Sequence, residues 1–361
     1  MRNMRFGVQG QTMKAIVALE DGTFFEGLSV GADGERTGEM VFNTSMTGYQ
    51  EILTDPSYKG QIVTMTYPLI GNYGINKEDV ESAAPKVEAF IAREFSRVTS
   101  NFRATGSLID YFKTFDIPAV EEIDTRALTK HLRVRGAMKG IVSTKDLNPE
   151  SLIRKAREWQ GILGRDLVKE VTCREPYVFQ ERKEEKGKKE DVTLNVERRT
   201  LNSTLHVVVM DFGVKMNILR ILNELGLQVT VVPASTSAEQ VLSMRPDGVL
   251  LSNGPGDPQG VPYAVREIRK LFGKVPLFGI CLGQQLLGLA YGGKTYKLKF
   301  GHRGGNQPIQ EVETGKVSIT SENHGFAVDM ASITDHPVKV THVNLNDKTV
   351  EGIKHATLPI F

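Results

Sequence analysis

The sequence predicts an α/β protein with two domains, and three observations support this fold class. The chain has 361 residues, which is too long for one ordinary hydrophobic core. A charge-dense stretch at 181–191 has no apolar face and divides the chain into halves of different pattern. In the second half, short apolar runs alternate with amphipathic segments. Such β/α alternation predicts a parallel sheet covered by helices on both faces.

In the first half, β-rich runs separated by Gly, Asn and Pro turns alternate with helical patterns. The expected strands are Lys14 to Leu19, Glu39 to Phe42 and Gln61 to Thr66. The expected helices lie near Pro85 to Phe95, Asp124 to Arg133 and Pro149 to Trp159. We therefore predict an extension at 1–12, a mixed α/β domain at 13–180 and a charged linker at 181–203.

The second predicted domain covers residues 204–361. Its expected strands are Leu205 to Met210, Gln228 to Pro233, Gly248 to Ser252 and Val275 to Ile280. Its expected helices are Val214 to Leu225, Ala238 to Met244, Tyr263 to Phe272 and Leu282 to Ala290. Ligands of such sheets bind beyond the carboxyl ends of the strands. Cys281 and the loop from Asn253 to Pro258 both follow a strand, so we expect the site there.

Composition excludes several classes of partner. The 45 Lys and Arg residues against 43 Asp and Glu residues give a net charge of +2, so no basic field favours nucleic acid or a lipid surface. The only cysteines, Cys173 and Cys281, lack metal-ligand spacing, which favours a reduced cytoplasmic protein without structural zinc. No apolar run has the length of a membrane span.

Cys281 has the sequence context of a nucleophile. The strand-like run ends at Gly279-Ile280, and Cys281 opens a helix with Gly283 close behind. Glycines on both sides tolerate the tight turn of a nucleophile elbow, and a helix N-terminus favours the thiolate over the thiol. The backbone N–H of Leu282 would then point at a developing oxyanion. The alternative is a buried core cysteine, since free cysteine is often fully buried.

Two further segments have a structural and a functional interpretation. The loop Ser252 to Pro258 is either a tight turn or a second oxyanion donor, because its glycines let backbone N–H groups approach a substrate. Asn323 to Phe326 is either an ordinary turn or a holder of polar substrate. No motif marks a base among the remaining histidines, which are His131, His206, His302, His336, His342 and His355.

Together, these motifs resemble a known family. Asn253-Gly-Pro-Gly-Asp257 and Gly279-Ile-Cys-Leu-Gly-Gln284 resemble the paired signatures of class I, triad-type glutamine amidotransferases. The first half narrows the resemblance to the carbamoyl-phosphate synthetase small chain. The segments that carry it are Phe42 to Glu51, Thr54 to Tyr58, Ile123 to Arg126, Phe300 to His302, Gly304 to Asn306 and Asn323 to Ala327.

The resemblance implies a flavodoxin-like second domain of the class I amidotransferase fold, with Cys281 as the nucleophile. It implies that glutamine is held by Ser57, Gly254, Gly256, Leu282, Gln285, Asn323, Gly325 and Phe326. The implied reaction is hydrolysis of L-glutamine to glutamate and ammonia through a γ-glutamyl thioester. Ammonia would pass to a large synthetase chain that binds ATP and magnesium and uses bicarbonate, with no cofactor or metal on this chain.

The family pattern runs past a segment like Pro359-Ile-Phe361 into a strand carrying Gly-His-Pro-Glu and a closing helix. The resemblance therefore implies that the catalytic base, its orienting carboxylate and this last strand and helix are absent from this chain. Three hypotheses stay open: a glutaminase subunit, a non-catalytic partner that binds glutamine or supports the large chain, and a cysteine hydrolase acting on another amide.

Overall fold

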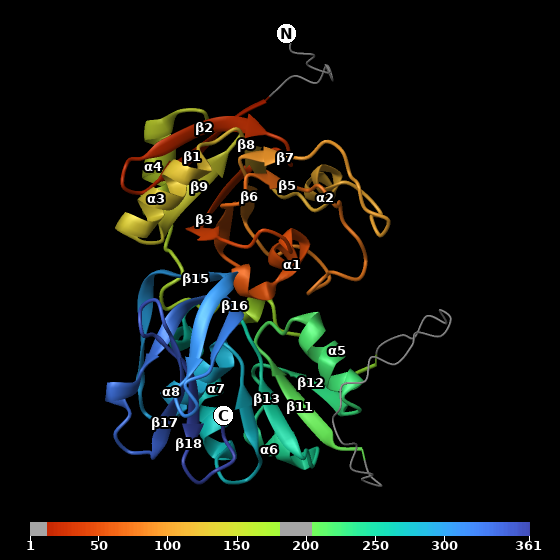
Figure 1. Ribbon diagram of the computed structural model, residues 1–361, viewed down its shortest axis with the longest axis vertical. Coiled ribbons are helices and arrows are strands. Elements are labelled where there is room, and N and C mark those ends of the chain that lie inside the picture. Colours follow the sequence, from red (N-terminus) through yellow and green to blue (C-terminus); the bar gives the residue numbers. More distant parts are fainter. Residues whose placement is uncertain (1–12, 181–203) are drawn as a thin grey trace. The chain divides into compact units, whose positions relative to one another are not determined.

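The computed structural model describes residues 13–180 and 204–361 in two compact units (Figure 1). The predicted extension at 1–12 and linker at 181–203 lie outside the described residues. Described residues 13–54, 58–162 and 303–306 form unit 1, and residues 55–57, 163–302 and 307–361 form unit 2. Unit 2 therefore includes 163–180, which the sequence-based division assigned to the first domain.

Unit 1 is built on a closed barrel. Its strands neighbour one another in the order β1, β2, β8, β6, β4, β3, β9. Their bounds are β1 (Met13–Leu19), β2 (Phe24–Ser29), β3 (Glu35–Asn43), β4 (Gln61–Met65), β6 (Ala89–Ile91), β8 (Ala119–Glu121) and β9 (Met138–Ser143). The β3–β4, β4–β6 and β6–β8 pairs are parallel and the others antiparallel. Closure leaves no strand of the barrel with an unpaired edge.

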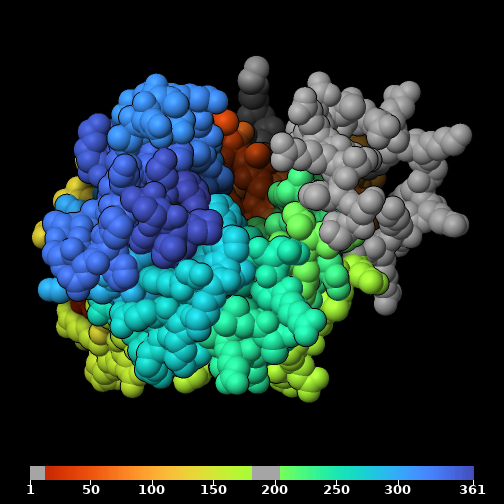
Figure 2. All heavy atoms as spheres, turned by 90° about the horizontal axis from the view of Figure 1, so that it is seen from below, coloured from red at the N-terminus to blue at the C-terminus, as the bar shows by residue number. Residues whose placement is uncertain are grey.

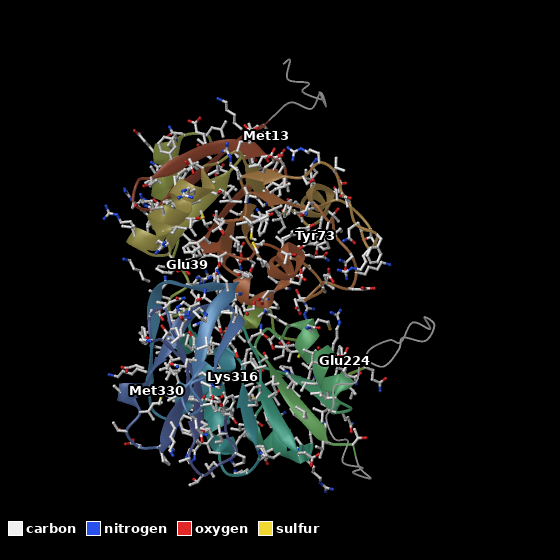
Figure 3. The ribbon with its side chains drawn as sticks, viewed as in Figure 1. Met13, Glu39, Tyr73, Glu224, Lys316 and Met330 are labelled. Atoms are coloured by element: carbon white, nitrogen blue, oxygen red, sulfur yellow. The ribbon has the colours of Figure 1, made fainter. Side chains whose placement is uncertain are left out.

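The helices of unit 1 follow from local sequence signals. They are α1 (Tyr49–Thr54), α2 (Leu108–Thr114), α3 (Thr125–Arg135) and α4 (Pro149–Glu158). Asp124 caps α3 by accepting from the N–H of Ala127, and Asn148 caps α4 just before Pro149 at its first position. The predicted helices at these two places are confirmed. Tyr73, labelled in Figure 3, stacks on Tyr49 with ring centroids 4.1 Å apart.

The predicted helix near Pro85 to Phe95 is wrong. This segment forms β6 and the short strand β7 (Glu94–Phe95), which pairs with β5 (Leu69–Ile70). Ala89, Phe90 and Ile91 are each fully buried, and β6 is a strand of the barrel that lies between two parallel neighbours. A short strand buried on both sides shows a continuous apolar run, which cannot be told from a buried helix by periodicity alone.

Unit 2 contains the predicted parallel sheet. Its strands are β10 (Tyr177–Phe179), β11 (His206–Asp211), β12 (Gln228–Pro233), β13 (Gly248–Leu251) and β14 (Leu277–Gly279), in the order β10, β12, β11, β13, β14. Strands β11 to β14 run parallel in a flavodoxin-like order, and β10 is antiparallel at one edge. Beside β14, the N–H of Gly279 donates to the carbonyl of Phe361 at 2.8 Å.

Helices cover both faces of this sheet, as predicted. They are α5 (Met216–Glu224), α6 (Ala238–Ser243), α7 (Pro262–Leu271) and α8 (Leu282–Ala290). Along β11, Val208 and Met210 pack in one core with α6, α7 and α8, whereas Val209 packs in another with Leu219 of α5. This division follows from the strand period of two, which sends successive side chains to opposite faces.

A second sheet, which the sequence interpretation did not assign, follows α8. Its strands are β15 (Lys294–Glu311), β16 (Val317–Asp329), β17 (Val338–Asn344) and β18 (Val350–His355), in the order β16, β15, β17, β18. Ile353 of β18 shares the core of α7 and α8, and in Figure 2 the blue atoms of the last strands lie against cyan atoms of that region. Within the described residues, no helix is long and apolar enough to cross a membrane.

Candidate active site

Cys281 lies on a strained turn between β14 and α8. Its φ of 53° and ψ of −107° place a non-glycine residue in a region that L-amino acids rarely adopt. Such strain costs about 1–3 kcal/mol and persists only where the surroundings fix it. Here the N–H of Ile280 donates to the carbonyl of Leu251 at 2.9 Å, and the N–H of Gln285 donates to the carbonyl of Cys281 at 3.1 Å. The turn has the conformation that a nucleophile elbow requires.

Gly279 and Gly283, which flank the elbow, lie where the backbone leaves no room for a side chain. A Cβ on Gly279 would lie 2.7 Å from the backbone nitrogen of Gln284. A Cβ on Gly283 would collide with the carbonyl of Leu251 in β13. Helix α8 therefore begins directly against the parallel sheet, and this close approach brings Cys281 to the carboxyl edge of the strands.

The loop after β13 lies beside the elbow. The N–H of Gly283 donates to the carbonyl of Ser252 at 3.1 Å. Gly254 has no room for a Cβ, which would collide with the carbonyl of Phe212 and crowd the side chain of Leu282. Gly256 has a φ of +84°, which favours glycine. The loop expected to approach the elbow does so.

A polar network joins three other segments to this edge. Asp55 accepts from the side-chain amide of Asn323 at 3.0 Å and forms an ion pair with Lys215 at 3.1 Å. The side-chain amide of Asn253 donates to the Ser57 hydroxyl at 3.0 Å and to the carbonyl of Gly213 at 2.8 Å. Residues 55–57 thus belong structurally to the sheet edge of unit 2.

A cavity of about 380 Å³ opens over the sulfur of Cys281. Of the nine predicted site residues, which are the nucleophile and eight glutamine-holding residues, five line it: Cys281, Ser57, Gln285, Asn323 and Phe326. The other four, Gly254, Gly256, Leu282 and Gly325, do not line it. The side-chain amide of Gln285 donates to the carbonyl of Phe326 at 2.7 Å, which ties α8 to β16 under the cavity.

Asn323 to Phe326, which the sequence suggested as a turn, lies inside strand β16. The carbonyl of Asn323 accepts from the Cys281 thiol at 3.5 Å. The turn interpretation is wrong because Asn and Gly are turn residues by local propensity, while pairing within the second sheet decides their conformation here.

The environment of Cys281 favours the thiol. Burial, followed by the nearby carboxylates of Asp55 and Glu322, raises the pKa of the Cys281 thiol to about 12. Lys215 and the backbone N–H of Leu282 act in the opposite direction but do not outweigh these effects. The N–H of Leu282 at the start of α8 does favour the thiolate, as expected, but burial is the largest contribution and outweighs it.

Sequence reasoning missed several charged residues of the cavity. Asp55, Lys215, Glu322 and Glu351 all line it, but none was predicted as a site residue, although Asp55 lies within the segment Thr54 to Tyr58. The sequence signal for Asp55 was its position two residues before Ser57. Glu322 likewise directly precedes Asn323, whereas Lys215 and Glu351 had no such signal, because they come from distant elements that only the fold brings together.

Comparisons with known proteins agree with this geometry. Residues 17–142 match the family described as carbamoyl-phosphate synthase small chain, CPSase domain, and residues 208–361 match glutamine amidotransferase class-I. The chain is 59% identical to the carbamoyl phosphate synthase small chain of Syntrophotalea carbinolica, covering 97% of this chain and 91% of that protein.

Two further relatives carry the same name. The small chain of Rhodopirellula baltica is 53% identical over 94% of this chain and 88% of that protein. The small chain of Aquifex aeolicus is 51% identical over 96% of this chain and 91% of that protein. This chain therefore belongs to the carbamoyl-phosphate synthase small-chain family, and its second half is a class I glutamine amidotransferase domain.

Proposed function

We propose that this chain hydrolyses L-glutamine to glutamate and ammonia, with Cys281 as the nucleophile. The observation that carries the proposal is the strained elbow, which places Cys281 in the lining of a cavity that also holds several charged side chains. A buried core cysteine needs no left-handed backbone, whereas a nucleophile at the end of a strand does.

The reaction divides one acyl transfer into two steps. The sulfur of Cys281 attacks the carboxamide carbon, a C–S bond forms, the C–N bond breaks, and the thiol proton leaves with ammonia. Water then attacks the γ-glutamyl thioester, which releases glutamate and restores the thiol. In the structure, the backbone N–H of Leu282 donates to the Cys281 sulfur. During the reaction, this N–H would be a donor close to the developing oxyanion.

The cavity offers partners for both ends of an amino acid. The carboxylates of Asp55 and Glu322 would attract an α-ammonium group, and the Lys215 ammonium would attract an α-carboxylate. We propose that Ser57, Gln285, Asn323 and Phe326 hold the substrate directly. Gly254, Gly256 and Gly325 would act through the backbone shape that they permit.

The proton carrier is not supplied by His324, the one histidine among the described residues that line the cavity. Its Nδ1 faces the carbonyl of Phe326 at 2.9 Å, and its Nε2 faces Glu351 at 3.2 Å. Both ring nitrogens thus have partners other than the thiol.

We further propose a carbamoyl-phosphate synthase large chain as the partner that receives ammonia in the cytoplasm. ATP and magnesium would then act on that partner. Support comes from the names of the relatives and from the match of residues 17–142, which extends beyond the amidotransferase domain. Nucleic acid and membranes are not proposed as partners, given the net charge of +2.

Acid quenching of the native complex during turnover tests this function. We expect mass spectrometry to find a glutamyl acyl group on the peptide that contains Cys281, together with ammonia release from glutamine. Binding of glutamine without an adduct or ammonia would support the non-catalytic partner instead. Faster turnover of asparagine or a peptide amide would support the cysteine hydrolase of another amide.

A further inference from the structure

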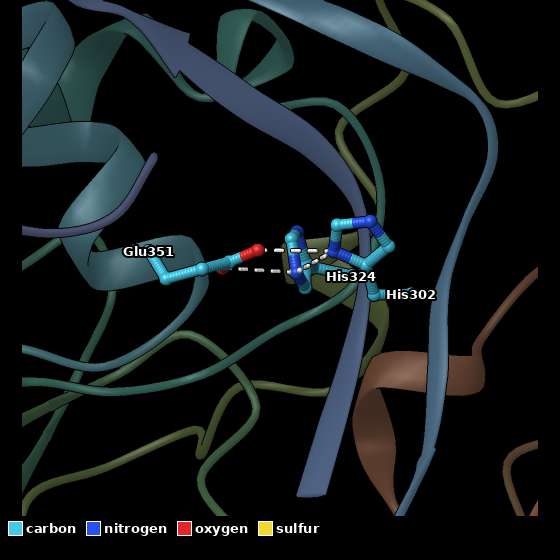
Figure 4. A group of neighbouring side chains, drawn as sticks. All are labelled: His302, His324 and Glu351. Atoms are coloured by element: carbon cyan, nitrogen blue, oxygen red, sulfur yellow. Dashed lines mark hydrogen bonds and ion pairs between the residues drawn. The ribbon is translucent and has the colours of Figure 1, made fainter. Parts of the chain in front are cut away.

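Two histidines and a glutamate from three strands meet inside unit 2. His302 is on β15, His324 on β16 and Glu351 on β18, and Figure 4 shows the three side chains directed at one another. All three side chains are less than 10% exposed. Within the described residues, they form a group whose ligand atoms lie within 4.8 Å of one another.

The distances within this group are short and similar. His302 Nδ1 lies 3.2 Å from His324 Nε2 and 3.0 Å from Glu351 Oε1, and His324 Nε2 lies 3.2 Å from Glu351 Oε2. Tetrahedral zinc with bonds of about 2.0–2.1 Å separates its ligand atoms by roughly 3.3 Å. Movements of a few tenths of an ångström would therefore let the group hold such an ion.

The outer nitrogen of each imidazole is already engaged. His302 Nε2 lies 2.8 Å from Asp347 Oδ2, and His324 Nδ1 lies 2.9 Å from the carbonyl of Phe326. Because a carbonyl and a carboxylate only accept, both outer nitrogens carry the hydrogen. A carboxylate or backbone carbonyl behind each histidine is the arrangement that orients histidine ligands of metals.

The other ring nitrogens, His302 Nδ1 and His324 Nε2, then carry no hydrogen, and their lone pairs face other acceptors. Among the described residues, His324 Nε2 faces His302 Nδ1 and the carboxylates of Glu351 and Glu322, the latter at 3.7 Å. The amide of Asn344 approaches His302 Nδ1 only at 3.4 Å. Buried lone pairs are costly where donors are few, and the Asn344 amide is the one neutral donor that the described residues offer this group, so a cation at its centre would be stabilising.

A proton is the simplest such cation, but it suits this group less well than a metal. One proton on an imidazole bridges two acceptors, whereas three acceptor groups converge here. A divalent ion, whose charge the Glu351 carboxylate partly neutralises, would accept a lone pair from each of the three groups at once.

We propose that His302, His324 and Glu351 form a binding site for a divalent transition metal of the zinc type. The sequence interpretation disfavoured structural zinc because the two cysteines lack metal-ligand spacing, whereas this site consists of histidines and a glutamate that the sheet brings together from three strands. The ion would fix β16 at His324, next to Asn323, whose carbonyl contacts the Cys281 thiol. The proposal differs from glutamine hydrolysis in its test, which measures metal binding directly, although His324 and Glu351 also line the cavity at Cys281.

The test is metal titration of the full chain after chelation, with cobalt(II) as a spectroscopic probe and zinc as a competitor. A Cys281→Ser background prevents binding through the thiolate. We expect one ion per chain, visible d–d bands of a four-coordinate site with nitrogen and oxygen ligands, and a higher melting temperature with zinc.

The variants locate the ion. His302→Gln and Glu351→Gln should weaken binding more than tenfold, and Asp347→Asn, which removes only the orienting carboxylate, should weaken it about tenfold. His131→Gln is the matched control, because His131 pairs with Asp21 in unit 1, and it should bind as the parent does. If circular dichroism shows that the ligand variants do not fold, the metal affinity of the Asp347→Asn variant decides whether the site exists.

Three outcomes would overturn the site. The first is no stoichiometric binding in the Cys281→Ser chain, which would leave a proton as the cation. Another is equal affinity in the parent, Glu351→Gln and Asp347→Asn chains. The last is a cobalt spectrum with sulfur charge transfer that disappears with Cys281, because the metal would then bind only at the nucleophile.

Discussion

The two cysteines of unit 2 have similarly raised thiol pKa values and differ in backbone geometry. Both are half-buried, and burial is the main reason that the thiol pKa is raised to about 12 for each. Asp211 adds to this effect at Cys173, as Asp55 and Glu322 do at Cys281. Only Cys281 has a positive φ and lines the cavity. In this fold, backbone geometry identifies the proposed nucleophile and pKa does not.

The largest expected difference is in activity. Cys281→Ala should lower glutamine hydrolysis by a factor on the order of 10⁴ or more, because it removes the group that forms the covalent intermediate. Cys173→Ala should stay within about twofold of the parent, since Cys173 does not line the cavity. Ammonia release by the native complex measures both. Equal losses would mean that geometry fails to distinguish the two cysteines.

The second difference to examine is reactivity with iodoacetamide as pH changes. A pKa of about 12 leaves the thiolate fraction at pH 8 on the order of 10³-fold below that of a free cysteine near 8.5, so both cysteines should react slowly. Because a raised pKa moves ionisation to higher pH, both rates should rise about tenfold per pH unit above pH 9. Peptide mass spectrometry separates the two sites. A plateau near pH 9 for Cys281 alone would show that its thiolate is stabilised.

Backbone strain at Cys281 should reverse the relative stability of glycine and alanine variants between positions 281 and 173. At position 281, glycine should be more stable than alanine by about 1–2 kcal/mol, because glycine adopts positive φ without strain. At position 173, alanine should be more stable than glycine by about 0.5–1 kcal/mol, because glycine is more flexible in the unfolded chain. Urea unfolding of the four variants, followed by a signal from unit 2, checks this. The same order at both positions would exclude strain at the elbow.

The smallest effects concern the charges around Cys281. Glu322→Gln should lower the pKa of the Cys281 thiol and speed its alkylation several-fold, because a carboxylate disfavours the thiolate. Lys215→Met should slow alkylation, because the ammonium favours the thiolate. Neither residue contributes to the pKa of Cys173, so its alkylation rate within the same samples is the internal control. A parallel change at Cys173 would indicate loosening of the fold.

Much of unit 2 was predictable because its signals are local. The alternation of apolar runs and amphipathic segments predicted β11 to β14 and α5 to α8, and all are present. The elbow was predictable because Gly279 and Gly283 surround the only residue that could be a nucleophile there. In unit 1, the segment of β6 was not predictable, since a short buried strand lacks a period that separates it from a helix.

The sequence by itself determined the fold class, the position of the elbow and the family, because each depends on residues close together in the chain. Only the tertiary structure decided the state of the Cys281 thiol, since burial and the carboxylates of Asp55 and Glu322 come from separate elements. It also decided that His302, His324 and Glu351 converge from three strands. Sheet pairing sets such distances, and residues far apart in sequence carry no local signal of them.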